Sequence, residues 1–558
     1  MAKIPASEGN QVWDSSNIAE SYSGIVLPMT CSFAVQIYSI AYKNVALASG
    51  VSQRKVKEYE PIFQNLLGFF YGRVYYNMLN WYRMLTLFPG FRRNKENLDL
   101  MISAMSKAEL DEAHSKNVSM LFRIKYYSHL FVRVLFFGHT LRRFKSDVRA
   151  ILGQYRKKQL HNMPAHELMA AYDKFTSELL SRWSTTIDND FLVMNYYGAM
   201  RGLCRRENIP DHKVLDMVSN ITDIISAKQV QCLAAISKSM AENPEILSIA
   251  SSGKYAEALG IIMAKEKYTS IRAEIDDYLG KYGGRFANEL RLEAPDLDSD
   301  PEYLIRLLVL YSGKAWEKKA NADSGIPRIT FPKSILLRYL LKNTRKHIRH
   351  REELRLLRSQ AFSHVRKMLV ELGKRLSEAQ VIGEWHDIFY LEIDEVRRFI
   401  AGSSISMDLT GIIAHRKEDY SKFENINPES HFQTTGIPGV FLSNLNQNTK
   451  YEKIGKLNGQ GCSPGIITGK VKIMEKFELP ENNSIDIIVA KHTDPGWTPL
   501  LGICRGLIVE NGGILSHAAI VSRELNLPCV IGVKGATKLL AEGQTVTMNG
   551  STGEIDVS

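Results

Sequence analysis

A change in hydrophobic period along the chain constrains its fold more than any other feature. From about residue 12 to 425, apolar residues recur mostly at helical spacing, whereas after Gly459 short β-branched runs are bounded by Gly, Pro or Asn. Residues 426–456 show no sustained period and are rich in Asn, Ser, Thr, Gly and Pro. A chain of 558 residues is also too long to fold around a single hydrophobic core of ordinary size. We therefore expect a multidomain protein with a mainly α-helical region at 1–425, a linker at 426–456 and an α/β domain at 457–558.

The clearest helical pattern lies within residues 351–376. Its apolar residues recur at three- and four-residue steps and so share one face of a helix. A second stripe, roughly 90° around the axis, is basic; it consists of Arg351, Arg355, Arg358 and Arg366. Such a stripe is usually a solvated or salt-bridged margin of a packed helix. If the helix borders a cleft, the same stripe would clamp an anion, and the sequence leaves both readings open.

The pattern after Gly459 is typical of a compact layered α/β domain. One plain helix is expected at 517–525, followed by the stop signals Asn526 and Pro528, and a weaker helix after Pro495. The expected strands are residues 466–474, 484–490, 506–509 and 529–533, with a terminal hairpin at 545–549 and 554–557.

The run from Val509 to Leu525 carries the most chemical information. It predicts a strand, a turn at Gly512 and Gly513, and a helix that opens at Ser516 or His517. Glycines let the backbone approach a ligand closely, and the first turn of a helix presents unpaired N–H groups that hold phosphoryl oxygens. A neutral histidine there can attack a phosphorus atom, while Ser516 caps the helix and could also bond the phosphoryl group. Read alone, the run also fits a surface histidine after an ordinary glycine turn.

Other histidines occur in pairs that lack this setting. We expect these pairs, His161/His166 and His347/His350, on solvated surfaces.

Composition narrows the class of protein. The net charge of +11 favours an anionic partner, but no recognised nucleic-acid module is present, so nucleic acid is not expected. Six scattered cysteines without a CxxC pair argue against a metal site. No apolar stretch reaches the roughly 20 residues of a membrane span, and no signal peptide is visible. We expect a cytoplasmic protein without a membrane contact.

Four motifs in the C-terminal region resemble the phosphohistidine domain of phosphoenolpyruvate (PEP) synthase, pyruvate phosphate dikinase and rifampin phosphotransferase. The family is that of PEP-utilising enzymes, whose phosphohistidine domain is a swivelling α/β (β/β/α) domain. Residues 512–532 are similar to its phosphohistidine signature, which implies that His517 is the phosphorylated residue. The other similar segments, in chain order, are residues 461–465 with 469–471, His492–Pro499 and Met548–Ile555.

The helical region also resembles rifampin-phosphotransferase-like proteins, in which it binds the phosphoryl acceptor. The similar segments are residues 12–17, 28–30, 72–77, 80–83 and 387–391, with Glu20, Gly284, Arg285 and Glu289. The aromatic cluster at 75–81 equally fits simple core packing. Because transfer of a phosphoryl group needs positioned cations, we expect some of five arginines to face an acceptor cleft. These are Arg73, Arg285, Arg351, Arg355 and Arg358.

Full-length members of the family also carry an ATP-grasp domain before the helical region, and the synthases a pyruvate-binding barrel after the phosphohistidine domain. No GxxxxGK[ST] loop occurs here. The resemblance therefore implies a split phosphotransferase: ATP and Mg²⁺ bind a separate ATP-grasp subunit, this chain alone binds no cofactor, and His517 passes the β-phosphoryl group of ATP to a small-molecule hydroxyl. Two alternatives stay open, a phosphohistidine carrier used for signalling and an interaction scaffold.

Overall fold

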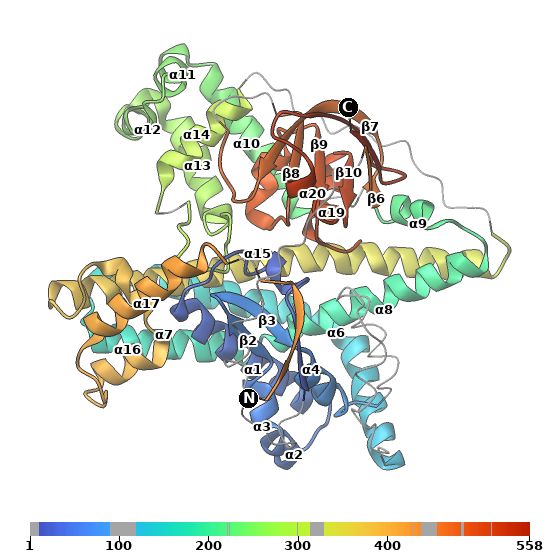
Figure 1. Ribbon diagram of the computed structural model, residues 1–558, viewed down its shortest axis with the longest axis horizontal. Helices are drawn as coiled ribbons and strands as arrows, with labels where there is room; N and C mark the ends of the chain where they lie inside the picture. Colours follow the sequence, from blue (N-terminus) through green and yellow to red (C-terminus); the bar gives the residue numbers. More distant parts are fainter. Residues whose placement is uncertain are drawn as a thin grey trace. The chain divides into compact units, whose positions relative to one another are not determined.

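The computed structural model describes residues 10–89, 119–219, 221, 224–297, 299–312, 329–426, 428–436, 455–480, 485–514 and 516–557. Its contacts form two compact units. The N-terminal unit comprises Met1–Asp188, Leu290–Glu293 and Ala361–Thr449, and the His517 unit comprises Asn189–Glu289, Ala294–Gln360 and Lys450–Ser558. The long helix α15, Lys333–Glu378, contributes to both units, and so does the start of α8, Ser184–Arg206 (Figure 1). The domain boundaries expected from the sequence stay a prediction.

The N-terminal unit consists of helices and one four-stranded antiparallel sheet in the order β2-β3-β1-β4. The strands are β1 (Asn10–Asp14), β2 (Leu67–Phe70), β3 (Arg73–Asn77) and β4 (His431–Thr435). The helices are α1 (Pro28–Ala48), α2 (Gln53–Glu58), α3 (Glu60–Gln64), α4 (Met78–Leu85), α6 (Met120–Arg156), α7 (Ala165–Leu180), α16 (Ile393–Ile400) and α17 (Leu409–Phe423).

This sheet was not expected, because the region reads as mostly helical. Its strands are only four or five residues long, and β1 pairs with β4 from the far end of the unit, so no local period reveals it. Strand β4 lies within the range expected to be a linker, of which residues 427 and 437–454 lie outside the described residues. Tyr75 and Trp81 of the aromatic cluster are buried, as core packing requires.

The His517 unit combines a helical layer with an eight-stranded sheet in the order β5-β12-β11-β7-β8-β9-β10-β6. The strands are β5 (Lys456–Asn458), β6 (Gln460–Ser463), β7 (Ile466–Met474), β8 (Ile487–Ala490), β9 (Gly506–Val509), β10 (Cys529–Ile531), β11 (Thr545–Asn549) and β12 (Glu554–Val557). The helices are α8 (Ser184–Arg206), α9 (Asp211–Met217), α10 (Ile225–Ala241), α11 (Pro244–Ser251), α12 (Tyr255–Ala264), α13 (Thr269–Tyr282), α14 (Pro301–Tyr311), α18 (Thr498–Leu501), α19 (His517–Leu525) and α20 (Ala536–Leu539).

The four central strands of this sheet, β7 to β10, run parallel, and the outer pairings are antiparallel. All residues of β8, β9 and β10 are buried, as expected for parallel strands covered on both faces. The strands and helix expected after Gly459 are present, and a mainly helical region with a strand-containing C-terminal domain is confirmed. Figure 1 shows α19 beside these strands.

Helix α19 is held by two hydrophobic clusters. Ala519 and Val521 belong to a core that continues through β9 and through α10 and α14, where Leu233 and Leu308 are fully buried. Ile520 instead packs in a cluster with residues of α8, α9 and α15. This packing fixes the helix whose first residue is His517.

Within the described ranges, no helix is long and apolar enough to cross a bilayer.

Candidate active site

His517 is the first residue of α19, which the loop after β9 leads into. The hydroxyl of Ser516 caps the helix and accepts a hydrogen bond from the N–H of Ala519 at 3.4 Å. Gly512 has a φ of 131°, a conformation that favours glycine, whereas a side chain at Gly513 would meet no atom within 4 Å. The turn and cap thus set the histidine at a helix N-terminus, as the sequence predicts, while the catalytic roles of these residues stay predictions.

The imidazole of His517 is almost completely buried, with 1% of the residue exposed. Burial is the main reason that the pKa of His517 falls to about 3; Glu352 opposes this, and Arg355 and Arg285 add to it. The ring is therefore neutral at pH 7, which is the form that can act as a nucleophile. The hydroxyl of Thr498, in the first turn of α18, lies 3.4 Å from Nε2 of the ring.

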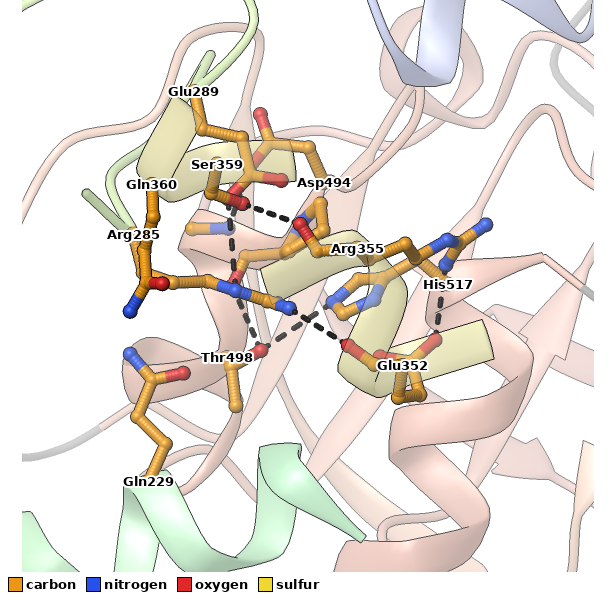
Figure 2. A network of polar contacts seen from close by, with 12 residues as sticks. Gln229, Arg285, Glu289, Glu352, Arg355, Ser359, Gln360, Asp494, Thr498 and His517 are labelled. Atoms are coloured by element: carbon orange, nitrogen blue, oxygen red, sulfur yellow. Dashed lines mark hydrogen bonds and ion pairs between the residues drawn. The ribbon is translucent and has the colours of Figure 1, made fainter. Parts of the chain in front are cut away.

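Arg285 lies at the centre of the charged groups near this histidine (Figure 2). Its side chain is fully buried; Nε lies 3.7 Å from the carboxylate of Glu289, and Nη2 donates to the carbonyl of Glu352 at 3.5 Å. Among the described residues, Nε and Nη1 have no hydrogen-bond partner. A buried guanidinium with free donors is costly unless an anion completes its bonds, so this part of the site suits phosphoryl oxygens.

Three more of the expected arginines lie on α15 in the same unit. Arg355 pairs with the carboxylate of Glu352 at 3.2 Å, and Arg351 pairs with Asp190 at 3.1 Å. The charges of Arg355 and Arg351 help to lower the pKa of His517, whereas the charge of Arg358 opposes the rise in the pKa of Glu289. These three arginines of the basic stripe are thus half-buried, and Arg351 and Arg355 are ion-paired; the fourth, Arg366, is buried and belongs to the N-terminal unit.

The fifth arginine, Arg73, belongs to the N-terminal unit. It opens β3 and donates a hydrogen bond to the carbonyl of Tyr71 at 3.0 Å. Burial lowers the pKa of its guanidinium. Its part in acceptor binding stays a prediction.

Three acidic residues and a threonine of the network were not expected as site residues: Glu289, Glu352, Asp494 and Thr498. Asp494 and Thr498 lie inside the motif at 492–499, and Glu352 stands three residues before Arg355 on the same expected helix. The sequence therefore contained a cue for each of these three residues.

The two buried acids Asp494 and Glu352 differ in their surroundings. The oxygens of Asp494 accept the N–H groups of Asn288 and Gly496, each at 2.8 Å. Burial raises the pKa of Asp494 to about 7. The pKa of Glu352 is lowered, because nearby positive charges, Arg355 foremost, outweigh the effect of its burial.

The expectation for the paired histidines is wrong in one case. His161 and His166 are exposed and His350 is half-buried, but His347 is buried and its Nδ1 lies 3.0 Å from the side-chain oxygen of Asn189. Burial lowers the pKa of His347 to about 3. It lies on the inner face of α15 and packs against Tyr196 of α8, a contact between helices that the local sequence does not reveal.

Two family models match the parts of the chain that build this network. The model of the PEP-utilising enzyme, mobile domain, matches residues 483–553, and that of the rifampicin phosphotransferase fourth domain matches residues 187–352. This chain contains a PEP-utilising enzyme mobile domain. The family resemblance expected from the sequence is confirmed. His517, Thr498 and Asp494 come from the mobile domain, and Arg285, Arg351 and Glu352 from the matched helical domain.

Curated relatives align with a longer part of the chain than the mobile domain. An uncharacterized protein of Mycobacterium tuberculosis is 28% identical over 67% of this chain and 40% of its own length. Rifampicin phosphotransferase of Bacillus cereus is 27% identical over 51% of this chain and 34% of its own length, and that of Bacillus subtilis is 32% identical over 34% and 21%. The chain thus spans less than half of the length of each of these relatives.

Proposed function

We propose that this chain is the phosphocarrier and acceptor-binding part of a phosphotransferase, with His517 as the transiently phosphorylated residue. One observation carries the proposal: a neutral, buried histidine at the start of α19 lies among the buried or half-buried charges of Arg285, Glu352 and Arg355. A histidine with only a packing role would not need a guanidinium with unused donors beside it.

In the first half-reaction, the imidazole lone pair of His517 attacks phosphorus and the bond to the leaving group of the donor breaks. We propose that the phosphoryl group derives from the β-phosphate of ATP and is delivered through a separate ATP-grasp subunit. N–H groups in the first turn of α19, other than that of Ala519, which donates to Ser516, would bond the phosphoryl oxygens.

In the second half-reaction, an acceptor hydroxyl attacks phosphorus and loses its proton, the P–N bond breaks and its electron pair returns to the imidazole. The transition state is loose and spreads charge over the equatorial oxygens, which positioned arginines stabilise. Arg285 suits this role best, because its Nε and Nη1 lack hydrogen-bond partners in the described part of the chain. The relatives named rifampicin phosphotransferase support a small-molecule hydroxyl as the acceptor.

The test is incubation with an ATP-grasp partner and ATP labelled in the β-phosphate. The chain should take up an acid-labile, base-stable label, and His517→Ala should take up none. His161→Ala, which changes an exposed histidine, is the matched control and should label normally. Label on His517→Ala would refute the assignment.

A further inference from the structure

Glu289 is a buried carboxylate that the two half-reactions above do not use. Its side chain is 1% exposed, and neither carboxylate oxygen has a hydrogen-bond partner among the described residues. Its nearest charge is Arg285, with Nε 3.7 Å away. A buried carboxylate with two free oxygens is costly, so a ligand that donates hydrogen bonds would stabilise it.

The hydroxyl group nearest to Glu289 donates its hydrogen elsewhere. The hydroxyl of Ser359 lies close to Glu289, but it has a single hydrogen and donates it to the carbonyl of Arg355 at 2.9 Å. Asp494, the other buried acid here, is different, because its two oxygens already accept the backbone N–H groups of Asn288 and Gly496. Glu289 is therefore the acid in this cluster with both oxygens available for an incoming O–H group.

Arg285 connects the Glu289 carboxylate with the proposed phosphoryl site. The same guanidinium faces the Glu289 carboxylate through Nε and the carbonyl of Glu352 through Nη2, and its charge acts on His517 (Figure 2). A cation shared in this way can hold a phosphoryl oxygen next to the carboxylate.

We propose that Glu289 binds the acceptor hydroxyl and removes its proton during transfer, an inference that rests on the proposed function of His517. In this step the O–H bond breaks as the O–P bond forms, the proton moves to a Glu289 oxygen, and the P–N electron pair stays on the imidazole. The proton then leaves to solvent when the product departs.

The electrostatics of the cluster agree with this role. Burial raises the pKa of Glu289, whereas the charges of Arg285, Arg358 and Arg355 and the nearby hydroxyl of Ser359 oppose this rise. Glu289 in turn contributes to the raised pKa of the neighbouring Asp494. A carboxylate with a raised pKa is a stronger base, and its ionisation shifts to higher pH, so transfer that depends on it should speed up as pH rises.

The experiment separates proton removal from positioning. The chain is phosphorylated chemically with phosphoramidate, and the decay of labelled phospho-His517 is followed with two probes. Glycerol must lose a proton to accept the group, whereas neutral imidazole attacks through a lone pair. In Glu289→Gln, discharge to glycerol should be about a hundredfold slower, discharge to imidazole should be unchanged, and the increase of the glycerol rate with pH should disappear.

Two further variants complete the design. Glu289→Asp should recover part of the glycerol rate, and Glu245→Gln, which alters an exposed acid of α11, should behave like the native chain. Equal slowing with both probes, or an unchanged pH profile, would overturn the inference while leaving the phosphohistidine intact. A native chain that takes up no label at His517 would overturn the proposed function and this inference together.

Discussion

Thr498 and His517 belong to two different helices and face each other, with Oγ1 of the threonine 3.4 Å from Nε2 of the ring. The threonine hydroxyl also donates to the carbonyl of Pro495 at 2.8 Å, which leaves its oxygen free to accept from Nε2–H. In the part of the chain that the structure describes, Nδ1 of the ring is buried and has no hydrogen-bond partner. The threonine is thus the side chain that orients this ring.

Thr498→Val should slow phosphorylation of His517 about tenfold, because valine keeps the shape and removes the hydrogen bond that orients the ring. The rate of label uptake from phosphoramidate measures this. Thr547→Val removes a hydroxyl from the exposed Thr468–Thr547 pair and is the matched control. A normal rate in Thr498→Val would show that packing alone orients the ring.

Arg285→Gln should slow the discharge of phospho-His517 to an acceptor about a hundredfold, since one oriented charge is worth on the order of 3 kcal/mol in such a transition state. Phosphorylation by a donor subunit should continue, because this arginine is proposed to act on the acceptor side. Rapid-quench measurements of both half-reactions test the difference. Arg338→Gln, at an exposed position of α15, should change neither rate. Equal losses in both half-reactions would contradict the assignment of Arg285 to acceptor transfer.

The buried His517 should make the protein less stable in acid. Its pKa is about 3 in the folded protein and near 6.5 when unfolded, so between these values the unfolded chain binds the additional proton. The free energy of unfolding should therefore fall as pH drops from 6.5 towards 3, by at most about 1.4 kcal/mol per pH unit from this group.

Urea denaturation at several pH values measures this contribution, and His517→Gln should lose less stability across the same window. His161→Gln should follow the native chain, because that residue is exposed. A native-like pH dependence in His517→Gln would mean that the ring titrates normally in the folded protein.

Gly496→Ala should disturb the contact between the loop before α18 and residues 286–288. A Cβ at position 496 would overlap the backbone of Phe286 and Ala287, so the loop would have to move away. We expect a loss of several kcal/mol in the free energy of unfolding, as for other strained or overpacked core positions, and slower discharge of phospho-His517. Gly260→Ala in α12 is the control, because an added Cβ there would meet no atom within 4 Å, and it should be neutral or slightly stabilising. Thermal denaturation measures the stability of both variants. Equal melting temperatures for both variants would contradict this.

Local patterns determined much of the C-terminal region. Strand β7 and helix α19 have the bounds that the period and the stop signals indicate, and the glycine turn with the Ser516 cap leads to His517 as expected. These features depend on neighbours within a few residues, which is why the sequence contains them.

Tertiary structure decided which charges surround His517. Arg285, Glu352 and Asp494 lie far apart in the sequence and meet only because α15, the 286–288 segment and the loop before α18 pack together. Long-range packing also buried His347 and paired β1 with β4. No periodicity encodes such contacts, because they are set by how whole helices and sheets bury their apolar faces.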